Sequence, residues 1–456
     1  MTKEISTLFG QKLSSESKKL VDEVRSKLKQ PIHPKFDKDF NIYRFVLNAE
    51  RQYNKKKDII EHAIKTLDHH LRYRQCLNLD ELPDISMADN PLFAGKYLPS
   101  SEILNATDSN GRVLCYFEAK TMSLEGAIHS LRSTAACRFQ FYHFEHTLRK
   151  INEQEDKTGK LSSLRYIVDL NGYEINPFMM LFVTSGDMSY YSTLFHYENY
   201  PELVHPMEIV NVPKWIHMPY RLFRSMMPPG FTEKFKLHDG HFIKELEREI
   251  DEEDIPVSLE LEREIDEEDI PVSLGGINQE IQFTAAEIKS EDEYWQPPSE
   301  TILNQLENLH IYARKQKIIK IQIDENSTKK TLSWYFKNDG DIYFGIFYDL
   351  KNDDENYQKD DEIDMDTKIM IYPFFKILGN FNLVHEFDFI DLKNYGTYYL
   401  CFCNKHCWLH RRNVEILVEL SYSDGSEPER IFYDGKIDKN TEGILKTLKL
   451  RDFKDS

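Results

Sequence analysis

The stretch that decides the fold runs from Leu164 to Gly276. It begins with LRYIVDLNG (164–172), continues with NYPELVHPMEIVNVPKWIHMPYRLFRSMMPPGFTEKF (199–235) and closes with DIPVSLGG (269–276). A β-rich run is followed by a second buried strand at Met207–Val212 and then by an amphipathic helix rich in Trp, Phe and Met. Strands that alternate with helices predict a parallel sheet, because parallel strands need crossover connections. The apolar helix is suited to covering a cavity.

Length and composition indicate a folded protein of two or three domains. The chain has 456 residues, of which 40% are hydrophobic and 12% aromatic. No run reaches the ~18 apolar residues of a membrane span, and the N-terminus lacks the apolar core of a secretory signal. The six sparse cysteines are expected to be free thiols in a reducing compartment.

The net charge of −19 restricts the partners of the chain. It argues against nucleic-acid binding and against broad adhesion to anionic membranes, so any membrane contact must be local.

Periodicity changes along the chain. From Glu16 to about Leu79 apolar residues recur at helical spacing, and residues 124–150 are predicted to form one long amphipathic helix. After Gly276 short runs alternate between apolar and polar residues, which indicates an antiparallel β-sandwich. These predicted strands are 317–323, 331–336, 342–348, 398–402 and 414–420. The acidic run Asp353–Asp366 falls between strands and is interpreted as a solvated loop.

A perfect tandem repeat occupies residues 245–274, where ELEREIDEEDIPVSL occurs twice. Each copy carries seven acids and one arginine, so removal of one copy would change the net charge from −19 to −13. The unit is too short for a solenoid, and we interpret it as a recent duplication or a sequence error. Only one copy can occupy the native position, and Pro256 is expected to break any helix through the other.

These motifs, in their order, resemble the CRAL-TRIO lipid-binding family of the phosphatidylinositol-transfer type over well over half the chain. Ile42–Leu47 is similar to the start of the family's N-terminal helical module, and Gly111-Arg112 is similar to its Gly-Arg turn. The GOLD domain, which often follows a CRAL-TRIO domain, is resembled by two stretches. One is Leu332–Phe336 with the turn Asp339-Gly340 and Phe344–Phe347, and the other is Gly396–Leu400 with Asn404.

The resemblance implies a multidomain fold: an α-helical module, an α/β domain with a mixed, mostly parallel sheet and a lid helix, and an antiparallel GOLD β-sandwich. The expected parts are a flexible leader (1–15), the helical module (16–80), the CRAL-TRIO domain (81–276), a linker (277–314), the sandwich (315–425) and a C-terminal tail (426–456).

Residues 214–227 form the predicted lid helix. Its apolar stripe falls at helical spacing and is widened by Phe223, while Arg221 and Arg224 lie on the other face. This pattern suits a helix at a membrane interface, the lid of an apolar pocket, or a helix that packs its apolar face in the core and exposes its polar face to solvent. Alternation places Met207 and Ile209 on one face of their strand. The predicted pocket and lid residues are Trp215, Met218, Leu222, Phe223, Met226, Met207, Ile209, Phe178 and Phe182.

The resemblance also implies a head-group site. In phosphatidylinositol-binding members a Glu follows the Tyr-Pro turn and a Lys precedes the last core strand, which Glu202 and Lys234 match. The alternative is an ordinary surface ion pair. The family's basic Leu-Arg-Ala-Arg motif is replaced here by LNAER (47–51), so at least one phosphate-facing arginine is missing or moved.

Metal and catalytic motifs are weak. Cys401, Cys403, His406, Cys407 and His410 are crowded, but their spacing fits no standard zinc site. No nucleophile or dinucleotide motif occurs, and Asp169 is expected to end a strand rather than to act as a base. We therefore predict no catalytic residue, metal or cofactor, and no enzyme activity.

The predicted function is lipid binding and lipid transfer in the cytoplasm, peripheral to membranes, with a role in membrane trafficking. A phospholipid such as phosphatidylinositol, or an isoprenoid, would occupy a hydrophobic pocket. The alternative is a lipid-sensing adaptor whose output is a protein partner bound by the GOLD domain. A lipid-modifying enzyme is a third, weaker alternative.

Overall fold

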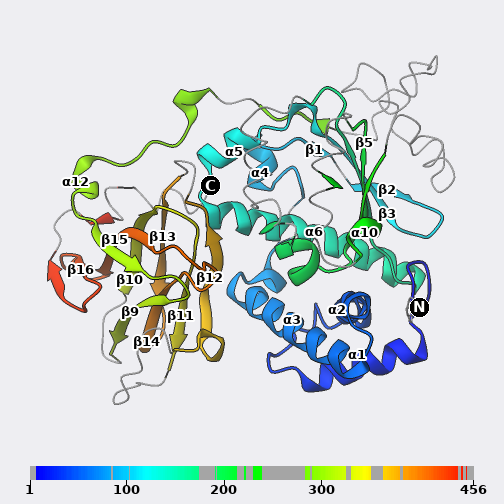
Figure 1. The fold of residues 1–456 in the computed structure, drawn as a ribbon, viewed down its shortest axis with the longest axis horizontal. Coiled ribbons are helices and arrows are strands. Elements are labelled where there is room, and N and C mark those ends of the chain that lie inside the picture. The colour runs from blue at the N-terminus through cyan, green and yellow to red at the C-terminus, as the bar shows by residue number, and fades with distance from the viewer. Residues whose placement is uncertain are drawn as a thin grey trace. The chain divides into compact units, whose positions relative to one another are not determined.

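The computed structural model describes residues 7–83, 86–101, 103–173, 190–191, 193–212, 220–221, 230–238, 283–287, 290–324, 330–350, 363–379, 384–439, 443–444 and 448. The chain divides into two compact units. The first contains residues 1–125 and 139–288, and the second contains residues 126–138 and 289–456. Figure 1 shows the helices and strands of both units, coloured from blue at the N-terminus to red at the C-terminus.

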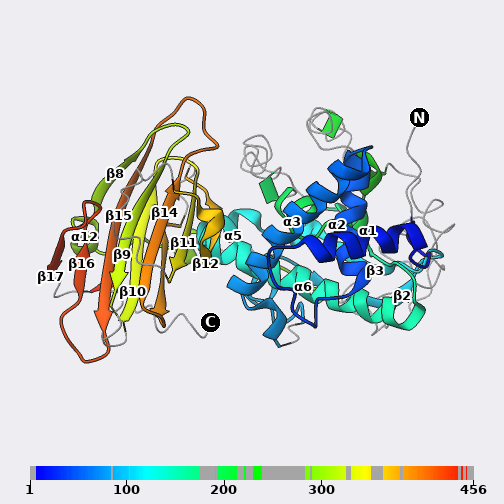
Figure 2. The same ribbon diagram turned by 90° about the horizontal axis from the view of Figure 1, so that it is seen from below.

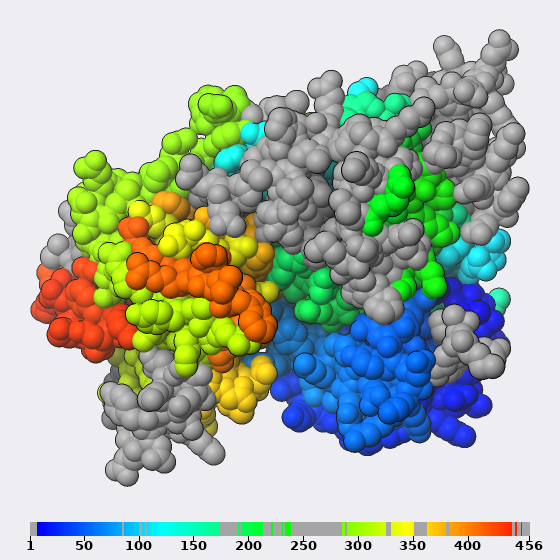
Figure 3. Space-filling model, viewed as in Figure 1, coloured from blue at the N-terminus to red at the C-terminus, as the bar shows by residue number. Residues whose placement is uncertain are grey.

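The first unit begins with three helices that pack on one another (Figure 1, blue), which confirms the predicted helical N-terminal region. In Figure 3 their atoms form the blue part of the surface. They are α1 (Ser15–Lys27), α2 (Asp39–Gln52) and α3 (Lys56–Cys76). Ser14 caps α1 by accepting the Ser17 N–H, and the apolar residues of α1 recur on its buried face. Short elements follow at η1 (Leu79–Glu81) and α4 (Pro91–Ala94).

Thr7 lies in the range predicted to be a flexible leader, but it is packed within the first unit. Thr7 is buried, its N–H donates to the Tyr43 hydroxyl at 3.0 Å, and its hydroxyl lies 2.8 Å from that of Ser17. Gly10 N–H donates to the Leu161 carbonyl at 2.8 Å. Residues 7–14 are thus held by hydrogen bonds to the helical region and to the chain before β4, which fixes the approach to α1.

A five-stranded sheet forms the centre of the first unit, in the order β2-β3-β4-β5-β6. Only the β2–β3 pair is antiparallel, so the predicted mixed, mostly parallel sheet is confirmed. Its strands are β2 (Ile103–Thr107), β3 (Val113–Glu118), β4 (Leu164–Asp169), β5 (Val204–Val210) and β6 (Phe235–Leu237). A separate antiparallel pair joins β1 (Ser100–Ser101) to β7 (Phe283–Thr284).

Connecting helices complete the first unit. The crossover helix α6 joins β3 to β4, η3 precedes β5, and α10 leads directly into β6. Their bounds, with the short η2 after β3, are η2 (Ala119–Thr121), α6 (Ser133–Thr158), η3 (Leu194–Asn199) and α10 (Phe231–Lys234). None of the described helices is long and apolar enough to cross a bilayer.

The single helix predicted at 124–150 is wrong, because two helices occupy this segment. Helix α5 (Leu124–Ser130) ends before Arg132, and α6 begins at Ser133. At the break Arg132 forms an ion pair with Asp388 (3.3 Å), and the Glu386 carboxylate accepts the Thr134 N–H (3.3 Å) at the first turn of α6. The Glu386 side chain therefore accepts a backbone N–H that has no partner within the helix, and a new helix begins at this point.

The second unit contains two antiparallel sheets, as predicted for the C-terminal region (Figure 2). One has the order β13-β10-β15-β16-β17 with β8 also paired to β15, and the other has the order β12-β11-β14-β9. The strands are β8 (Glu307–Ile311), β9 (Gln316–Ile323), β10 (Lys330–Asn338), β11 (Ile342–Asp349), β12 (Ile369–Ile377), β13 (Glu386–Leu392), β14 (Gly396–Cys403), β15 (Arg412–Tyr422), β16 (Glu429–Ile431) and β17 (Ile437–Lys439). Short helical turns are η8 (Glu291–Glu293), α12 (Glu300–Leu303) and η10 (Met365–Thr367).

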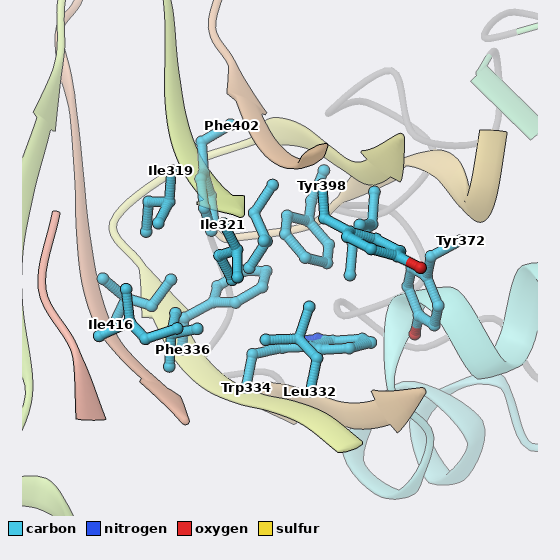
Figure 4. Packing of buried hydrophobic residues seen from close by; sticks show 14 of the residues in the cluster. Ile319, Ile321, Leu332, Trp334, Phe336, Tyr372, Tyr398, Phe402 and Ile416 are labelled. Atoms are coloured by element: carbon cyan, nitrogen blue, oxygen red, sulfur yellow. The ribbon is translucent and has the colours of Figure 1, made fainter. Parts of the chain in front are cut away.

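One apolar core joins the two sheets. Trp334 and Phe336 of β10 and Phe402 of β14 lie in this core (Figure 4). The ring of Phe336 contacts that of Phe402, and the rings of Trp334 and Phe336 both contact Phe344 of β11. The Trp334 ring lies edge-on to Tyr372, with ring centres 4.7 Å apart, and Phe344 lies 4.8 Å from Phe402. Large rings in tilted contact bury extensive apolar area in a single layer, and this layer holds the sandwich together.

Strands β12 and β13 were not predicted. The sequence of β12, IMIYPFFKI, contains Pro373, which weakens a strand signal because proline cannot donate to a ladder. The structure places β12 at the edge of its sheet, where a missing donor is tolerated. Its register with β11 shifts beside Gly345, where an added Cβ would lie 2.8 Å from the Phe374 backbone. Strand β8 lies in the range predicted as linker, and β16 and β17 lie in the predicted tail.

Replacement of Trp334 by alanine tests the sandwich core. The side chain is fully buried, so Trp334→Ala should lower the free energy of unfolding by about 3–5 kcal/mol. Ile369, which is 58% exposed on β12, provides the control, and Ile369→Ala should change it by less than about 0.5 kcal/mol. Chemical denaturation followed by circular dichroism measures both. Equal effects of the two substitutions would contradict the described core.

Candidate functional site

A buried ion cluster lies in the first unit where three elements meet. We use this name for Arg51, Glu202, Glu233 and Lys234. Arg51 stands in the last turn of α2, Glu202 in the turn between η3 and β5, and the other two residues end α10 just before β6. The other three residues are more than 150 positions away from Arg51 in the sequence, so only folding brings the four together.

Glu202 is the centre of the cluster. Its side chain is fully buried, and one carboxylate oxygen, Oε1, lies 3.1 Å from the Lys234 ammonium and 3.2 Å from Arg51 Nε. The residue has a positive φ of 56°, so the turn after Pro201 directs the carboxylate inward from an uncommon backbone conformation. Burial alone would raise the pKa of this carboxyl, but the two cations lower it to about 2. Glu202 is therefore a buried anion at neutral pH.

Lys234 is buried equally deeply. Its ammonium also donates to the His196 carbonyl at 2.9 Å and lies 4.5 Å from the centre of the Tyr197 ring. Burial lowers the pKa of Lys234, and the Glu202 carboxylate opposes that shift. The structure thus brings the two predicted head-group residues together. Since their side chains are 2% and 0% exposed, the alternative of an ordinary surface ion pair does not describe them.

Arg51 connects this interior pair to the surface. Its Nη1 atom lies 2.5 Å from the Glu233 carboxylate, whose side chain is 65% exposed, and its Nη2 atom lies 3.3 Å from the His205 ring. The sequence reasoning assigned no role to Arg51. The available signal was its position, because it is the basic residue that remains where the resembling family has its Leu-Arg-Ala-Arg motif.

The cluster contains polar atoms without partners. In the described part of the chain, Glu202 Oε2, the Tyr197 hydroxyl and His205 Nδ1 are buried and have no hydrogen-bond partner. Buried polar atoms in native proteins are nearly always paired. Both donors and acceptors therefore remain for a polar group beside two cations.

An apolar sheet face adjoins the cluster. Met207 and Ile209 of β5 lie in register with Tyr166 and Val168 of β4, and all four are only partly buried. The alternate residues of both strands, such as Glu208, are buried on the opposite face. Parallel strands are normally covered on both faces, and the four side chains of this row are partly exposed.

Tyr197 links the apolar face to the ion cluster. Its ring packs in one group with Phe235 and Met207, and it also lies beside the Lys234 ammonium. Tyr220, one of two described residues of the predicted lid, joins this group and donates its hydroxyl to the Phe235 carbonyl at 2.8 Å. The other predicted pocket and lid residues lie outside the described residues: Trp215, Met218, Leu222, Phe223, Met226, Phe178 and Phe182.

A second group of buried charges occupies the opposite face of the sheet. Arg165 of β4 lies 2.8 Å from Glu208 and 3.3 Å from Asp108, and Arg112 pairs with Asp108 at 2.6 Å. Burial raises the pKa of Glu208, but the hydrogen bond with His238 and the charge of Arg165 lower it to about 2. These pairs join the Gly-Arg turn to β4 and β5, and their mutual pairing suits a role in holding the sheet.

Asp169 ends β4 as the sequence indicated. Its Oδ1 atom accepts the Asn171 N–H and the Asn211 side-chain amide, both at 2.8 Å, and its Oδ2 atom accepts the Tyr116 hydroxyl at 2.8 Å. The first two bonds hold the turn after β4, and the third joins β4 to β3. Across the described ranges no group of three His, Cys, Asp or Glu residues is placed to hold a metal ion, and Cys401 and Cys403 are both buried.

Comparison with known proteins agrees with this architecture. Residues 100–260 match the CRAL/TRIO domain model. This part of the chain is therefore similar to a CRAL-TRIO domain. Domains of this type generally bind lipids or other small hydrophobic ligands. Residues 13–82 match a domain of unknown function, DUF8435, and residues 293–429 match F28H7_8_C, described as a "-like, C-terminal domain". The GOLD resemblance of the sandwich stays a prediction from sequence.

A relative matches along nearly the whole chain. It is the CRAL-TRIO domain-containing protein F28H7.8 of Caenorhabditis elegans, which is 23% identical over 413 residues that cover 90% of this chain and 91% of the relative. Among solved structures, the crystal structure of Sfh5 is similar to 50% of this chain and 81% of its own, with 14% identity and a TM-score of 0.33.

The depressed pKa of Glu202 predicts a pH dependence of stability. The carboxyl has its ordinary pKa of 4.5 in the unfolded chain and about 2 in the folded one, so its contribution is complete above the first value and disappears as the pH falls toward the second. Glu202→Gln should therefore destabilise the protein at pH 6, and its difference from the wild type should shrink between pH 5 and pH 2. Denaturant titrations across this range measure it. A difference independent of pH would contradict an ionised, buried Glu202.

Proposed function

We propose that this protein binds a lipid with a phosphate-bearing head group, such as phosphatidylinositol, and carries or presents it between membranes. The observation that supports this most strongly is the adjacency of the buried ion cluster to the accessible apolar sheet face. A phospholipid has the same two chemistries side by side. No chemical step is needed for this role, so we propose a binding protein rather than an enzyme.

The apolar face supplies the affinity. Acyl chains that cover Met207, Ile209 and Val168 leave water, and each buried CH₂ contributes about 0.8 kcal/mol. The unbranched methionine side chain adapts to ligands of different shape. An isoprenoid would gain the same energy, so this face by itself selects for length and apolar character.

The ion cluster supplies the selection of the head group. Lys234 and Arg51 offer two cations to a phosphate, and Lys234 acts as a compact charge while Arg51 can donate through two nitrogens. The unpartnered Glu202 Oε2 atom can accept a hydroxyl hydrogen of the inositol ring. A phosphocholine head has no such hydroxyls, so we propose that phosphatidylinositol is preferred over phosphatidylcholine.

Residues 214–227 are proposed to act as the lid of this site. Their apolar stripe would rest at the membrane when open and cover the acyl chains when closed. Tyr220 ties the described part of this segment to β6 at the edge of the apolar group. The protein would work on the cytoplasmic side, peripheral to membranes, in membrane trafficking.

A second candidate function is that of a lipid-sensing adaptor. It is favoured by the C-terminal sandwich, which has a complete core of its own and a separate family match at residues 293–429. In that case the lipid would be sensed and a protein partner bound by the sandwich would carry the output. A carrier should exchange its lipid with vesicles, whereas an adaptor should keep it.

Lys234→Ala tests the head-group site. The change removes one of the two cations beside Glu202, so uptake of fluorescent phosphatidylinositol from vesicles should fall at least tenfold, while uptake of phosphatidylcholine should fall much less. Mass spectrometry of lipids extracted from the purified wild type should show a stoichiometric phospholipid. Lys65, which lies outside the cluster, gives the matched control Lys65→Ala, with uptake like the wild type. Unchanged phosphatidylinositol uptake by Lys234→Ala would overturn the assignment.

Glu233→Gln tests whether a carboxylate competes with the ligand. The exposed Glu233 occupies Arg51 Nη1, and a phosphate that binds Arg51 must displace it. Because an exposed pair of this kind is worth up to about 1 kcal/mol, the variant should bind phosphatidylinositol about threefold to fivefold more tightly. Glu61, equally exposed and paired with Lys57, is the control. Weaker binding by Glu233→Gln would show instead that Glu233 helps to hold the ligand.

A further inference from the structure

We propose that the sandwich carries a second membrane-binding surface, which docks on anionic lipid bilayers independently of the lipid site. It consists of the loop between β14 and β15, residues 404–411, and the neighbouring turn, residues 312–315. We refer to these two segments together as the tryptophan surface. Nothing in the proposed lipid-binding role requires it.

Large apolar side chains are exposed on this surface. Trp408 is 70% exposed, Leu409 is 85% exposed and Tyr312 is 64% exposed. Single exposed apolar residues are common, but an adjacent Trp-Leu pair at a loop tip with a tyrosine beside it is a cluster. Trp and Tyr are the side chains that favour the interface between lipid and water, because each combines an apolar ring with a polar atom.

Hydrogen bonds hold the two segments in this exposed form. The Asn404 side-chain amide donates to the carbonyls of Ile311, Tyr312 and His410, at 3.2, 3.3 and 2.9 Å. Arg314 N–H lies 3.1 Å from the carbonyls of both Asn404 and Cys407, and its guanidinium covers the Trp408 ring at 3.8 Å. A fixed backbone keeps Trp408 and Leu409 from folding back onto the sandwich, so little ordering entropy is lost on docking.

The charges within these two segments all have one sign, and the acidic neighbours Asp341 and Asp339 lie at the base of the loop beside His406 and Asn413. Arg314, Lys315, Lys405 and Arg411 are exposed, and residues 312–323 and 404–414 contain no Asp or Glu. Both segments are thus locally basic in a chain of net charge −19. Each Lys or Arg near an anionic leaflet contributes about 1 kcal/mol, and the acidic remainder of the protein is repelled. The field therefore turns this surface toward the membrane.

A lipid bilayer fits this combination better than a protein partner does. The apolar residues stand at the tip of a loop with cations around its base, which matches shallow insertion between acidic head groups. Two or three inserted side chains and four cations give reversible binding that weakens with salt. This docking would hold the protein at the membrane while lipid exchange takes place elsewhere on the chain.

Sedimentation of the full-length protein with vesicles tests the proposal. The wild type should bind phosphatidylcholine vesicles that contain phosphatidylserine much more tightly than pure phosphatidylcholine vesicles. The double variant Trp408→Ala/Leu409→Ala should bind them at least tenfold more weakly, since each apolar side chain contributes about 1.5 kcal/mol or more on insertion. Lys405→Glu/Arg411→Glu should lose the preference for phosphatidylserine and the dependence on salt.

Two controls keep the outcomes distinct. Ile369→Ala/Ile437→Ala removes apolar residues that are 58% and 60% exposed elsewhere on the sandwich, and it should bind vesicles like the wild type. Lys65→Ala, which removes an exposed lysine outside both the ion cluster and the tryptophan surface, should also bind like the wild type. The proposal is overturned if the wild type ignores phosphatidylserine vesicles, or if Trp408→Ala/Leu409→Ala sediments with them unchanged.

Discussion

The contact between Glu202 and its two cations is the interaction on which the first unit depends. A buried carboxylate is tolerated only when opposite charges and hydrogen bonds replace the water it has lost. Here Lys234 and Arg51 provide these charges from α10 and α2. The ion cluster thus requires the N-terminal helices, the turn before β5 and the start of β6 to be in place together. Loss of one partner would leave a buried charge uncompensated.

The same requirement makes the cluster suitable for a ligand. A pair of apolar residues of equal volume would hold these elements together at lower energetic cost, so the buried charges give the fold little that packing could not provide. Glu202 Oε2 and the Tyr197 hydroxyl lie beside these charges without hydrogen-bond partners, and burying them in this state costs free energy of folding. A phosphate with neighbouring hydroxyls would satisfy these atoms, and in that respect the site is complementary to its proposed ligand.

The sandwich is organised differently. Its two sheets meet through rings and branched aliphatic residues in one layer, and its charged residues lie mainly outside that layer. Such a core fixes a rigid frame, and a rigid frame can present loops with defined side chains. The tryptophan surface is a loop of this kind, and Asn404 holds it to the frame through three carbonyls.

The sequence predicted the elements with clear periodicity and missed those defined by tertiary contacts. Strand β4 and the pairing of Glu202 with Lys234 followed from local pattern and family resemblance. For Arg51 the resemblance offered only a position, in the segment that replaces the family's Leu-Arg-Ala-Arg motif. Its role could not be predicted, because its partners Glu202 and Glu233 are distant in sequence. The break before α6 depends on Glu386 and Asp388, which lie more than 200 residues away.

An experimental structure of the protein incubated with phosphatidylinositol tests the central claim most directly. The account predicts a lipid whose phosphate lies within hydrogen-bond distance of Lys234 Nζ and Arg51, with Glu233 displaced and acyl chains against Met207 and Ile209. A structure in which the protein's own side chains fill the space over that sheet face, with no lipid bound, would contradict it.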